Sequence, residues 1–283
     1  MGQPWDAVAR AADKVAERLG RASVGVVLGS GLSECLESLD RPRFMEFSSI
    51  PGMPAPTTSG HRGAVMHAHQ DGTPVLALCG RIHLYEGRSH DEVALGVRML
   101  SALGVHTLVV TSAVTSLDED LAAGQMMLVE DHVNQSGTSV LMGEHEPRFG
   151  PRFPDMVGAY DEQLLDVVQE VGVLAGVELG RGVLAHVHGP AYETPAEAKL
   201  ARLVGARVAS MSMVPEVEAA RQRGMRVVGL ACVTNVHAGR RREGRENEVL
   251  ASNARLTDSL QTLLSGVIPR LGKPPERRAV ERR

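Results

Sequence analysis

Short aliphatic runs recur along the 283-residue chain, and stretches of helical periodicity separate most of them. The runs lie at residues 24–28, 75–79, 107–111, 126–129, 183–187, 208–211 and 227–233. Helical spacing of apolar residues covers 5–19, 90–103, 160–174, 195–204, 215–224 and 247–268, and Pro269 is expected to end the last helix. Strands that alternate with helices indicate a layered α/β structure. We therefore expect one α/β domain over residues 1–272, with a central mixed β-sheet flanked by helices, and a disordered tail over residues 273–283.

Composition supports this fold class and limits the partners. Aromatic residues make up only 3% of the chain, so the core must be aliphatic, which is typical of a buried parallel or mixed sheet. The net charge of −4 gives no overall attraction to nucleic acid or to a membrane. The charged N-terminal helix is unlike a signal peptide, and no apolar run is long enough to cross a bilayer. We expect a cytoplasmic protein with buried free thiols at Cys79 and Cys232, and a solvated arginine cluster between Arg240 and Arg245.

The first apolar run ends in a turn of small residues, Gly29-Ser30-Gly31. Small residues let the backbone approach an anion, and the amides that begin a following helix point toward it. A plain turn explains these residues equally well. The segment lacks the later glycine of a dinucleotide fingerprint and the Lys-Ser/Thr pair of a P-loop. These gaps disfavour a dinucleotide-dependent oxidoreductase.

The second run is followed by Arg81, His83 and Tyr85, which alternate in sequence. In an extended conformation these three side chains share one face. The planar guanidinium of Arg81 suits phosphate, and His83 and Tyr85 add hydrogen bonds at the same face. His61, after a glycine, is a further candidate anion ligand. The residues alone leave an anion site and an ordinary surface strand equally open.

Two later runs end beside a carboxylate and a carboxamide, Glu193 and Asn235. Glutamate accepts a hydrogen bond from a ring N–H, and asparagine both donates and accepts, so together they can read a purine edge. Taken singly, Glu193 is also explained as a charge at a helix N-terminus, and Asn235 as a turn former.

The order of these pieces carries the strongest indication of function. Gly29-Ser30-Gly31-Leu32 and Gly60-His61 come first, and Gly80-Arg81-x-His83-x-Tyr85-Glu86-Gly87 follows. The later blocks are Tyr192-Glu193-Thr194, Met211-Ser212-x-Val214-Pro215-Glu216 and Thr234-Asn235. In this order they resemble the trimeric purine nucleoside phosphorylases, over residues 24–250 and including the stretch 148–156.

The resemblance implies phosphorolysis of 6-oxopurine nucleosides by a homotrimer, with inorganic phosphate as co-substrate and no metal or organic cofactor. It assigns phosphate binding to Ser30, His61, Arg81, His83, Ser212 and the backbone amide of Ala113. It assigns nucleoside binding to Tyr85, Tyr192, Glu193, Met211, Asn235 and Glu246, with Phe153 reaching into a neighbouring subunit's site. Within this set it implies catalytic roles for Asn235, Glu193 and His83.

The chain departs from the family pattern at a few positions. The expected loop at 112–116 has Ser112 where asparagine is usual, and Val114-Thr115-Ser116 replaces an alanine and two glycines beside the phosphate and base pockets. Ser210 replaces a glycine, and Glu246 replaces a histidine that would contact the 5′-hydroxyl. These changes keep two alternatives open: a relative with altered specificity, such as for a 5′-modified nucleoside, and a non-catalytic nucleoside-binding homologue. Relatives selective for adenine usually carry aspartates near Asn235, which disfavours a 6-aminopurine.

Overall fold

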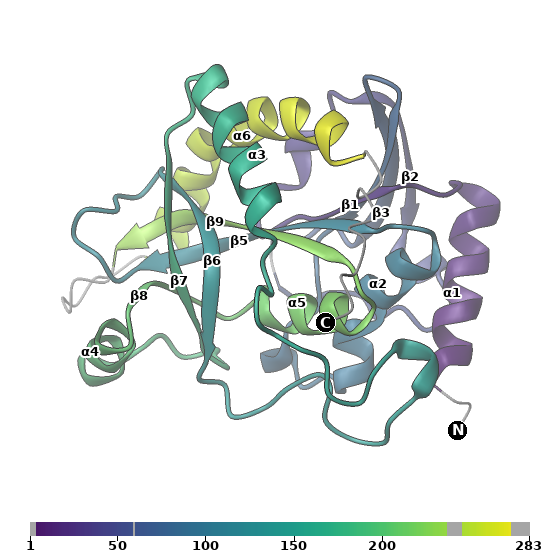
Figure 1. Cartoon of the computed structure of the whole chain (residues 1–283), viewed down its shortest axis with the longest axis horizontal. Helices are drawn as coiled ribbons and strands as arrows, with labels where there is room; N and C mark the ends of the chain where they lie inside the picture. The colour runs from purple at the N-terminus through teal and green to yellow at the C-terminus, as the bar shows by residue number, and fades with distance from the viewer. Residues whose placement is uncertain (1–3, 59, 237–244, 273–283) are drawn as a thin grey trace, which may run out of the picture.

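One mixed sheet organises the chain, as the computed structural model shows (Figure 1). The structure describes residues 4–58, 60–236 and 245–272, without the side chains of Ser33 and of residues 245–255. The strands are β1 (Val24–Val27), β2 (Asp40–Glu46), β3 (Ala64–Gln70), β4 (Thr73–Cys79), β5 (Thr107–Ser116), β6 (Met126–Asn134), β7 (Leu179–His186), β8 (Ala206–Ser210) and β9 (Arg226–Val236). Within the described residues they form a sheet of nine strands in the order β2-β3-β4-β1-β5-β8-β7-β6-β9.

The sheet closes on itself at one end. β5 pairs in parallel with both β1 and β9, and its last two residues pair antiparallel with β8. Because β9 also pairs with β6, the strands β5, β8, β7, β6 and β9 form a closed ring. The carboxyl ends of β1, β4, β5 and β9 therefore meet near the end of β8, which is where α/β sheets place ligands.

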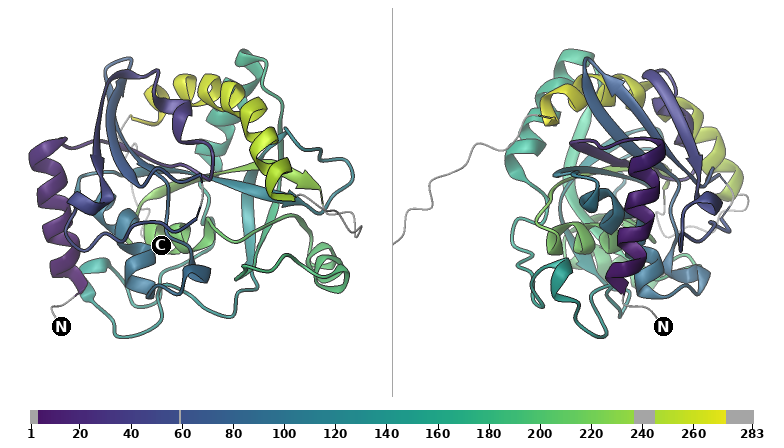
Figure 2. Two further views of the ribbon diagram at one scale, coloured as in Figure 1. Left: turned by 180° about the vertical axis from the view of Figure 1, so that it is seen from behind. Right: turned by 90° about the vertical axis from the view of Figure 1, so that its right-hand side faces the viewer.

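Helices cover both faces of the sheet (Figure 2). On one face, α3 (Glu162–Ala175) packs against α6 (Arg245–Leu271), and α6 also contacts β9, β3 and β4. On the other, α2 (His90–Ala102) packs between α1 (Pro4–Arg18) and α5 (Val214–Gln222), while α4 (Pro195–Leu203) lies beside β8. The buried core is almost entirely aliphatic, and Cys35, Cys79 and Cys232 are buried free thiols. The predicted α/β domain with a mixed central sheet is confirmed.

Two local expectations were wrong, and two strands were missed. The residues expected to form a loop at 112–116 belong to β5, because β-branched Val114 and Thr115 favour extended backbone and pair with β9. Strands β2 and β3 were not predicted from the sequence; β2 is mostly exposed and polar, so it lacks an apolar pattern. Pro269 does not end α6, which continues to Leu271, where the Gly272 N–H closes the last turn on the Ile268 carbonyl. The arginine cluster at 240–244 and the tail at 273–283 lie outside the described residues.

Gly150 permits a close approach between the segment before α3 and helix α5. Its φ is 122° and ψ is −157°, a region that is open almost only to glycine, and a Cβ there would lie 2.0 Å from the Gln222 carbonyl oxygen. We expect Gly150→Ala to lower the free energy of unfolding by about 3 kcal/mol, measured by denaturant unfolding. The matched control is Gly158→Ala, where φ is 64° and no atom lies within 4 Å. It should cost only about 1 kcal/mol, and equal losses would contradict the steric argument.

Candidate active site

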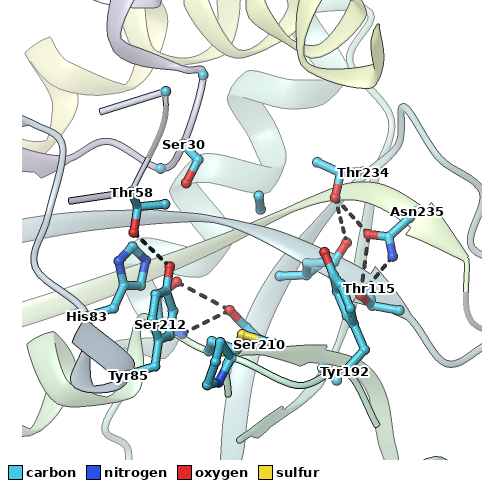
Figure 3. A pocket seen from close by; sticks show the side chains of 18 of the residues that line it. Ser30, Thr58, His83, Tyr85, Thr115, Tyr192, Ser210, Ser212, Thr234 and Asn235 are labelled. Carbon is cyan, nitrogen blue, oxygen red and sulfur yellow. Dashed lines mark hydrogen bonds between the residues drawn. The ribbon is translucent and has the colours of Figure 1, made fainter. Parts of the chain in front are cut away.

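A pocket of about 490 Å³ opens where the ends of β1, β4, β5, β8 and β9 meet (Figure 3). Its volume suits a small organic ligand. Polar side chains gather in two groups within it. Ser30, His83 and Ser212 lie toward one end, and Thr115, Thr234 and Asn235 toward the other.

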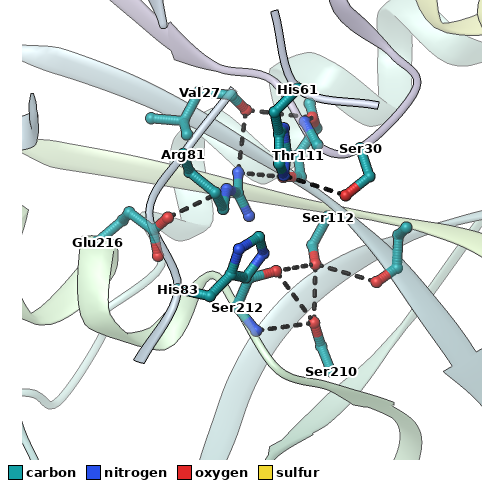
Figure 4. Close-up of polar contacts among 12 residues, drawn as sticks. Val27, Ser30, His61, Arg81, His83, Thr111, Ser112, Ser210, Ser212 and Glu216 are labelled. Carbon is teal, nitrogen blue, oxygen red and sulfur yellow. Dashed lines mark hydrogen bonds and ion pairs between the residues drawn. The ribbon is translucent and has the colours of Figure 1, made fainter. Parts of the chain in front are cut away.

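The first group centres on the guanidinium of Arg81, which is only 4% exposed. Its Nη2 donates to the carbonyl oxygens of Thr111 (2.6 Å) and Val27 (3.4 Å), and its Nε lies 3.1 Å from Oε1 of buried Glu216 (Figure 4). Burial lowers the pKa of Arg81 from its ordinary value, and the charge of Glu216 opposes this shift. Its Nη1 is buried and has no hydrogen-bond partner among the described residues. A fixed cation with a spare donor lining a pocket suits an anionic ligand.

His61 lies behind this group and supports Ser30. The two side chains are 3.1 Å apart, from the Ser30 hydroxyl to Nε2 of His61. Burial first, and then the nearby His83 and Arg81, lower the pKa of His61 to about 3, so its imidazole is neutral near pH 7. Gly80, with a φ of 118°, makes room for it, since a Cβ there would lie 2.9 Å from the His61 Cβ.

His83 and Tyr85 are held in place by hydrogen bonds from both sides. Oε1 of Glu86 accepts from the His83 backbone N–H at 2.7 Å and lies 3.2 Å from its Nδ1, while Oε2 accepts twice from Thr57. Burial would raise the pKa of Glu86, but these hydrogen bonds outweigh it and lower the pKa to about 2. The Tyr85 ring stacks on His83 at 4.7 Å, and its hydroxyl lies 3.0 Å from Thr58. Both rings thus face the pocket in fixed orientations.

Three serine hydroxyls meet where the middle of β5 passes the end of β8. Ser112 Oγ lies 2.6 Å from Ser212 Oγ and 2.8 Å from Ser210 Oγ, and the Ser212 backbone N–H donates to Ser210 Oγ at 3.2 Å (Figure 4). Ser210 and Ser212 line the pocket, whereas Ser112 is fully buried behind them. The turn that carries Ser212 into helix α5 requires a positive φ of 77° at Met213. This backbone conformation is unusual for a side-chain-bearing residue and is typical of a functional site.

The second group is built around the carboxamide of Asn235, near the end of β9. Thr234 Oγ1 donates to its Oδ1 at 2.9 Å, and its Nδ2 donates to Thr115 Oγ1 at 3.0 Å (Figure 3). Each amide atom keeps further hydrogen-bonding capacity, so Asn235 can present a donor and an acceptor to a ligand. Tyr192, 42% exposed, lies at the same end, and the adjacent Glu193 also lines the pocket (Figure 3). This end of the pocket can therefore bind a planar ring that carries both hydrogen-bond donors and acceptors.

The pocket brings together most of the residues that the sequence nominated. Those lining it are Ser30, Arg81, His83, Tyr85, Ala113, Tyr192, Glu193, Met211, Ser212 and Asn235. His61 contacts Ser30 from behind the lining. Phe153 lies outside the pocket and is 87% exposed, and the side chain of Glu246 falls outside the described residues. Ser116 also lies past the pocket, where its hydroxyl donates to the Asp118 carbonyl.

Several residues that support the site received no role from the sequence. Ser112, Thr115 and Ser210 stood out only as departures from the family pattern, Glu86, Glu216 and Thr234 only as parts of motifs, and Thr58 and Thr111 were not singled out. For some of them, adjacency to a nominated site residue could have indicated a role in the site. Thr111 and Ser112 directly precede Ala113, and Glu86 follows Tyr85. Thr58 carries no such signal, because only the fold brings it to Tyr85.

Two buried histidines near the pocket make stability depend on pH. Burial is the main reason that the pKa of His61 falls to about 3 and that of His186 to about 4. Between pH 6.5 and these values the unfolded chain binds more protons than the folded one, so stability falls as pH falls. We expect a loss of up to about 1.4 kcal/mol per pH unit for each histidine below pH 6.5. Denaturant unfolding from pH 8 to pH 5 measures this; His186→Gln should flatten the slope, and an unchanged slope would contradict it.

The described residues hold no cluster of three or more His, Cys, Asp or Glu side chains suited to a metal ion. Among them there is also no helix with the length and apolar character needed to cross a bilayer.

Comparison with known proteins agrees with this geometry. Residues 23–269 match the Phosphorylase superfamily model. The chain is 39% identical over 213 residues to purine nucleoside phosphorylase 1 of Bacillus subtilis, covering 75% of this chain and 79% of that protein. It is 38% identical to the Bos taurus purine nucleoside phosphorylase over 70% of each chain.

Solved structures give the same result over a longer span. The Schistosoma mansoni purine nucleoside phosphorylase in complex with inosine superposes with a TM-score of 0.88 at 30% identity, covering 96% of this chain and 97% of that one. The schistosome enzyme in complex with hypoxanthine gives 0.89 at 30% identity, over 95% and 98% of the two chains. Sequence, fold and pocket together place this chain in the purine nucleoside phosphorylase family.

Proposed function

We propose that this protein uses inorganic phosphate to split 6-oxopurine ribonucleosides and deoxyribonucleosides, releasing the free base and the pentose 1-phosphate. The observation that carries the proposal is that one pocket has a buried cationic end and, opposite it, an end with an amide and a carboxylate. A nucleoside spans two such ends when its base lies at one and its anomeric carbon faces the other. The family of the chain supports the same reaction.

At the cationic end, the spare Nη1 of Arg81 supplies the charge that holds phosphate. Ser30, His83, Ser212 and the backbone amide of Ala113 line the same end and add hydrogen bonds. Arg81 is already engaged by Glu216, so its charge is partly balanced before phosphate arrives. The bound phosphate therefore keeps enough negative charge to act as a nucleophile.

At the other end, the base is read by its hydrogen-bonding edge. Glu193 accepts from a ring N–H of a 6-oxopurine, and Asn235 donates to the 6-oxo group. The Asn235 carbonyl oxygen can accept from N7–H only once the leaving purine has taken a proton at N7. Tyr192 packs against the ring at the mouth. Tyr85 and Met211 both lie beside Gly189, between the two ends, and contact the sugar.

The reaction follows from how charge develops. As the C1′–N9 bond breaks, the purine takes the bonding electrons and the ribose becomes positive. Asn235 and Glu193 stabilise the leaving purine, which is electrostatic stabilisation directed at the transition state. A phosphate oxygen then forms the new bond at C1′, hydrogen phosphate gives up its proton as it becomes the ester, and the purine takes up a proton and leaves as the neutral base. His83, fixed by Glu86, holds the phosphate oriented for that attack.

We also propose that the working form is a cytoplasmic homotrimer in which Phe153 enters a neighbouring pocket. The side chain of Phe153 is 87% exposed, and Val157 nearby is 84% exposed, so both are available for contact with a neighbouring subunit. The mouth of the pocket at Tyr192 is open on the same chain. Analytical ultracentrifugation tests the trimer.

The decisive experiment measures purine release from inosine, guanosine and adenosine by the purified protein, with and without phosphate. We expect release from inosine and guanosine only when phosphate is present, with formation of pentose 1-phosphate. Preference for adenosine or a 5′-modified nucleoside would overturn the 6-oxopurine assignment. Binding of purine without any turnover would identify a non-catalytic homologue.

A further inference from the structure

Three serine hydroxyls, of Ser112 within β5 and of Ser210 and Ser212 at and just after the end of β8, form a hydrogen-bonded cluster behind the cationic end of the pocket. Ser112, Ser210 and Ser212 are 0%, 5% and 8% exposed, so water has little access to them. We propose that Ser112 and Ser210 are positioning residues that make the Ser212 hydroxyl an obligatory hydrogen-bond donor to phosphate. This inference rests on the proposed binding of phosphate beside Ser212.

The direction of the chain follows from counting protons. Each hydroxyl carries one proton and two acceptor lone pairs. The ionised oxygens of phosphate can only accept hydrogen bonds. A Ser212 hydroxyl that binds phosphate must therefore donate its single proton to a phosphate oxygen. In the 2.6 Å contact between Ser112 and Ser212, the donor must then be Ser112.

The same count fixes the next two links. Ser112 has donated its proton to Ser212, so in the 2.8 Å contact the donor is Ser210. The Ser210 and Ser212 hydroxyls also lie 3.3 Å apart, but both of their protons are then in use, so this longer contact carries no hydrogen bond when phosphate is bound. Ser210 in turn accepts from the Ser212 backbone N–H at 3.2 Å. The chain therefore runs from the Ser212 N–H through Ser210 and Ser112 to the Ser212 hydroxyl and on to phosphate.

A chain with one direction has a consequence for binding. Hydrogen bonds in series polarise one another, so Ser212 becomes a stronger donor to phosphate than an isolated serine. Without phosphate, Ser112 can instead donate to the Ala113 carbonyl at 3.2 Å, so the ligand itself selects the direction.

The test titrates inorganic phosphate calorimetrically into the full-length wild-type protein and its variants. Ser112→Ala should weaken phosphate binding about fivefold, because a hydrogen bond that supports a charged contact is lost. Ser112→Thr, which keeps a hydroxyl, should recover most of the affinity. Ser210→Ala removes the next link and should weaken binding in the same direction, which keeps the test valid if the Ser112 variant folds poorly.

The matched control is Ser116→Ala. Ser116 lies on the same strand, is equally buried at 0% exposed, and bonds to Asp118 outside the pocket. It should leave phosphate affinity unchanged even if it lowers the melting temperature. In turnover assays, Ser112→Ala should raise the KM for phosphate about fivefold, and the KM for inosine should change less than about twofold.

Two results would overturn the inference: wild-type affinity for phosphate in the Ser112→Ala and Ser210→Ala variants, or an equal loss in Ser116→Ala. Absence of phosphate binding to the wild type would overturn it as well. If the variants weaken phosphate binding as expected but the wild type releases no purine, the inference stands and the proposed function fails.

Discussion

Replacing Asn235 by alanine should lower kcat/KM for inosine by about 10²–10³-fold, because the carboxamide that stabilises the leaving purine is removed. The loss should appear in kcat more than in KM if the contact strengthens as the C1′–N9 bond breaks. Steady-state purine release at saturating phosphate measures both constants. The side chain is only 4% exposed and bonds to Thr115 and Thr234, so unfolding measurements must confirm that the variant is folded.

Two further variants separate the chemistry of Asn235 from its packing. Thr115→Val keeps a similar shape but removes the hydroxyl that accepts from Nδ2 of Asn235, so a loss of about tenfold is expected. Asn235→Asp offers acceptors only, so it should raise the ratio of adenosine to inosine turnover. A ratio that does not move would contradict the assignment of Asn235 to the 6-position of the purine.

The fold was largely predictable because its signals are local. Strand β1 and the buried part of β4 are mostly aliphatic, and α1 buries residues at helical spacing. Helix α2 begins at a Ser89 cap whose hydroxyl accepts from the Glu92 backbone N–H. β2 carries no such signal, since it is short of apolar residues and pairs at the edge of the sheet. The length of β5 depends on pairing with β9, a partner more than a hundred residues away, which local patterns do not encode.

The candidate site also has a part that local sequence predicts and a part that only the fold brings together. Motif order nominated the side chains that line the pocket, because each follows directly on a buried strand or opens a helix. The residues behind them were missed, since their roles come from contacts across the fold. Ser112 reaches Ser210 and Ser212 from about a hundred positions away, and Glu216 reaches Arg81 from another element. Thr115 stands where the family pattern has a glycine, and its hydroxyl contacts Asn235 directly.

Arg81→Met should reduce both activity and stability, for different reasons. Loss of the buried guanidinium removes the main charge that holds phosphate, so kcat/KM for phosphate should fall by about 10³-fold. Glu216, only 4% exposed, would be left without its cation, and this should lower the free energy of unfolding by about 3–5 kcal/mol. Steady-state kinetics and denaturant unfolding measure the two effects separately.

The double variant Arg81→Met/Glu216→Leu distinguishes these effects. Replacing a buried ion pair by apolar side chains is often neutral for stability, so most of the lost unfolding free energy should return. Activity should not return, because nothing in the double variant supplies the spare donor that Nη1 of Arg81 offers. Recovery of phosphate turnover together with stability would mean that Arg81 acts only through the fold, and phosphate would then have to be held by the neutral donors around Ser30 and Ser212. Loss of activity in a stable double variant would place the phosphate charge on Arg81 itself.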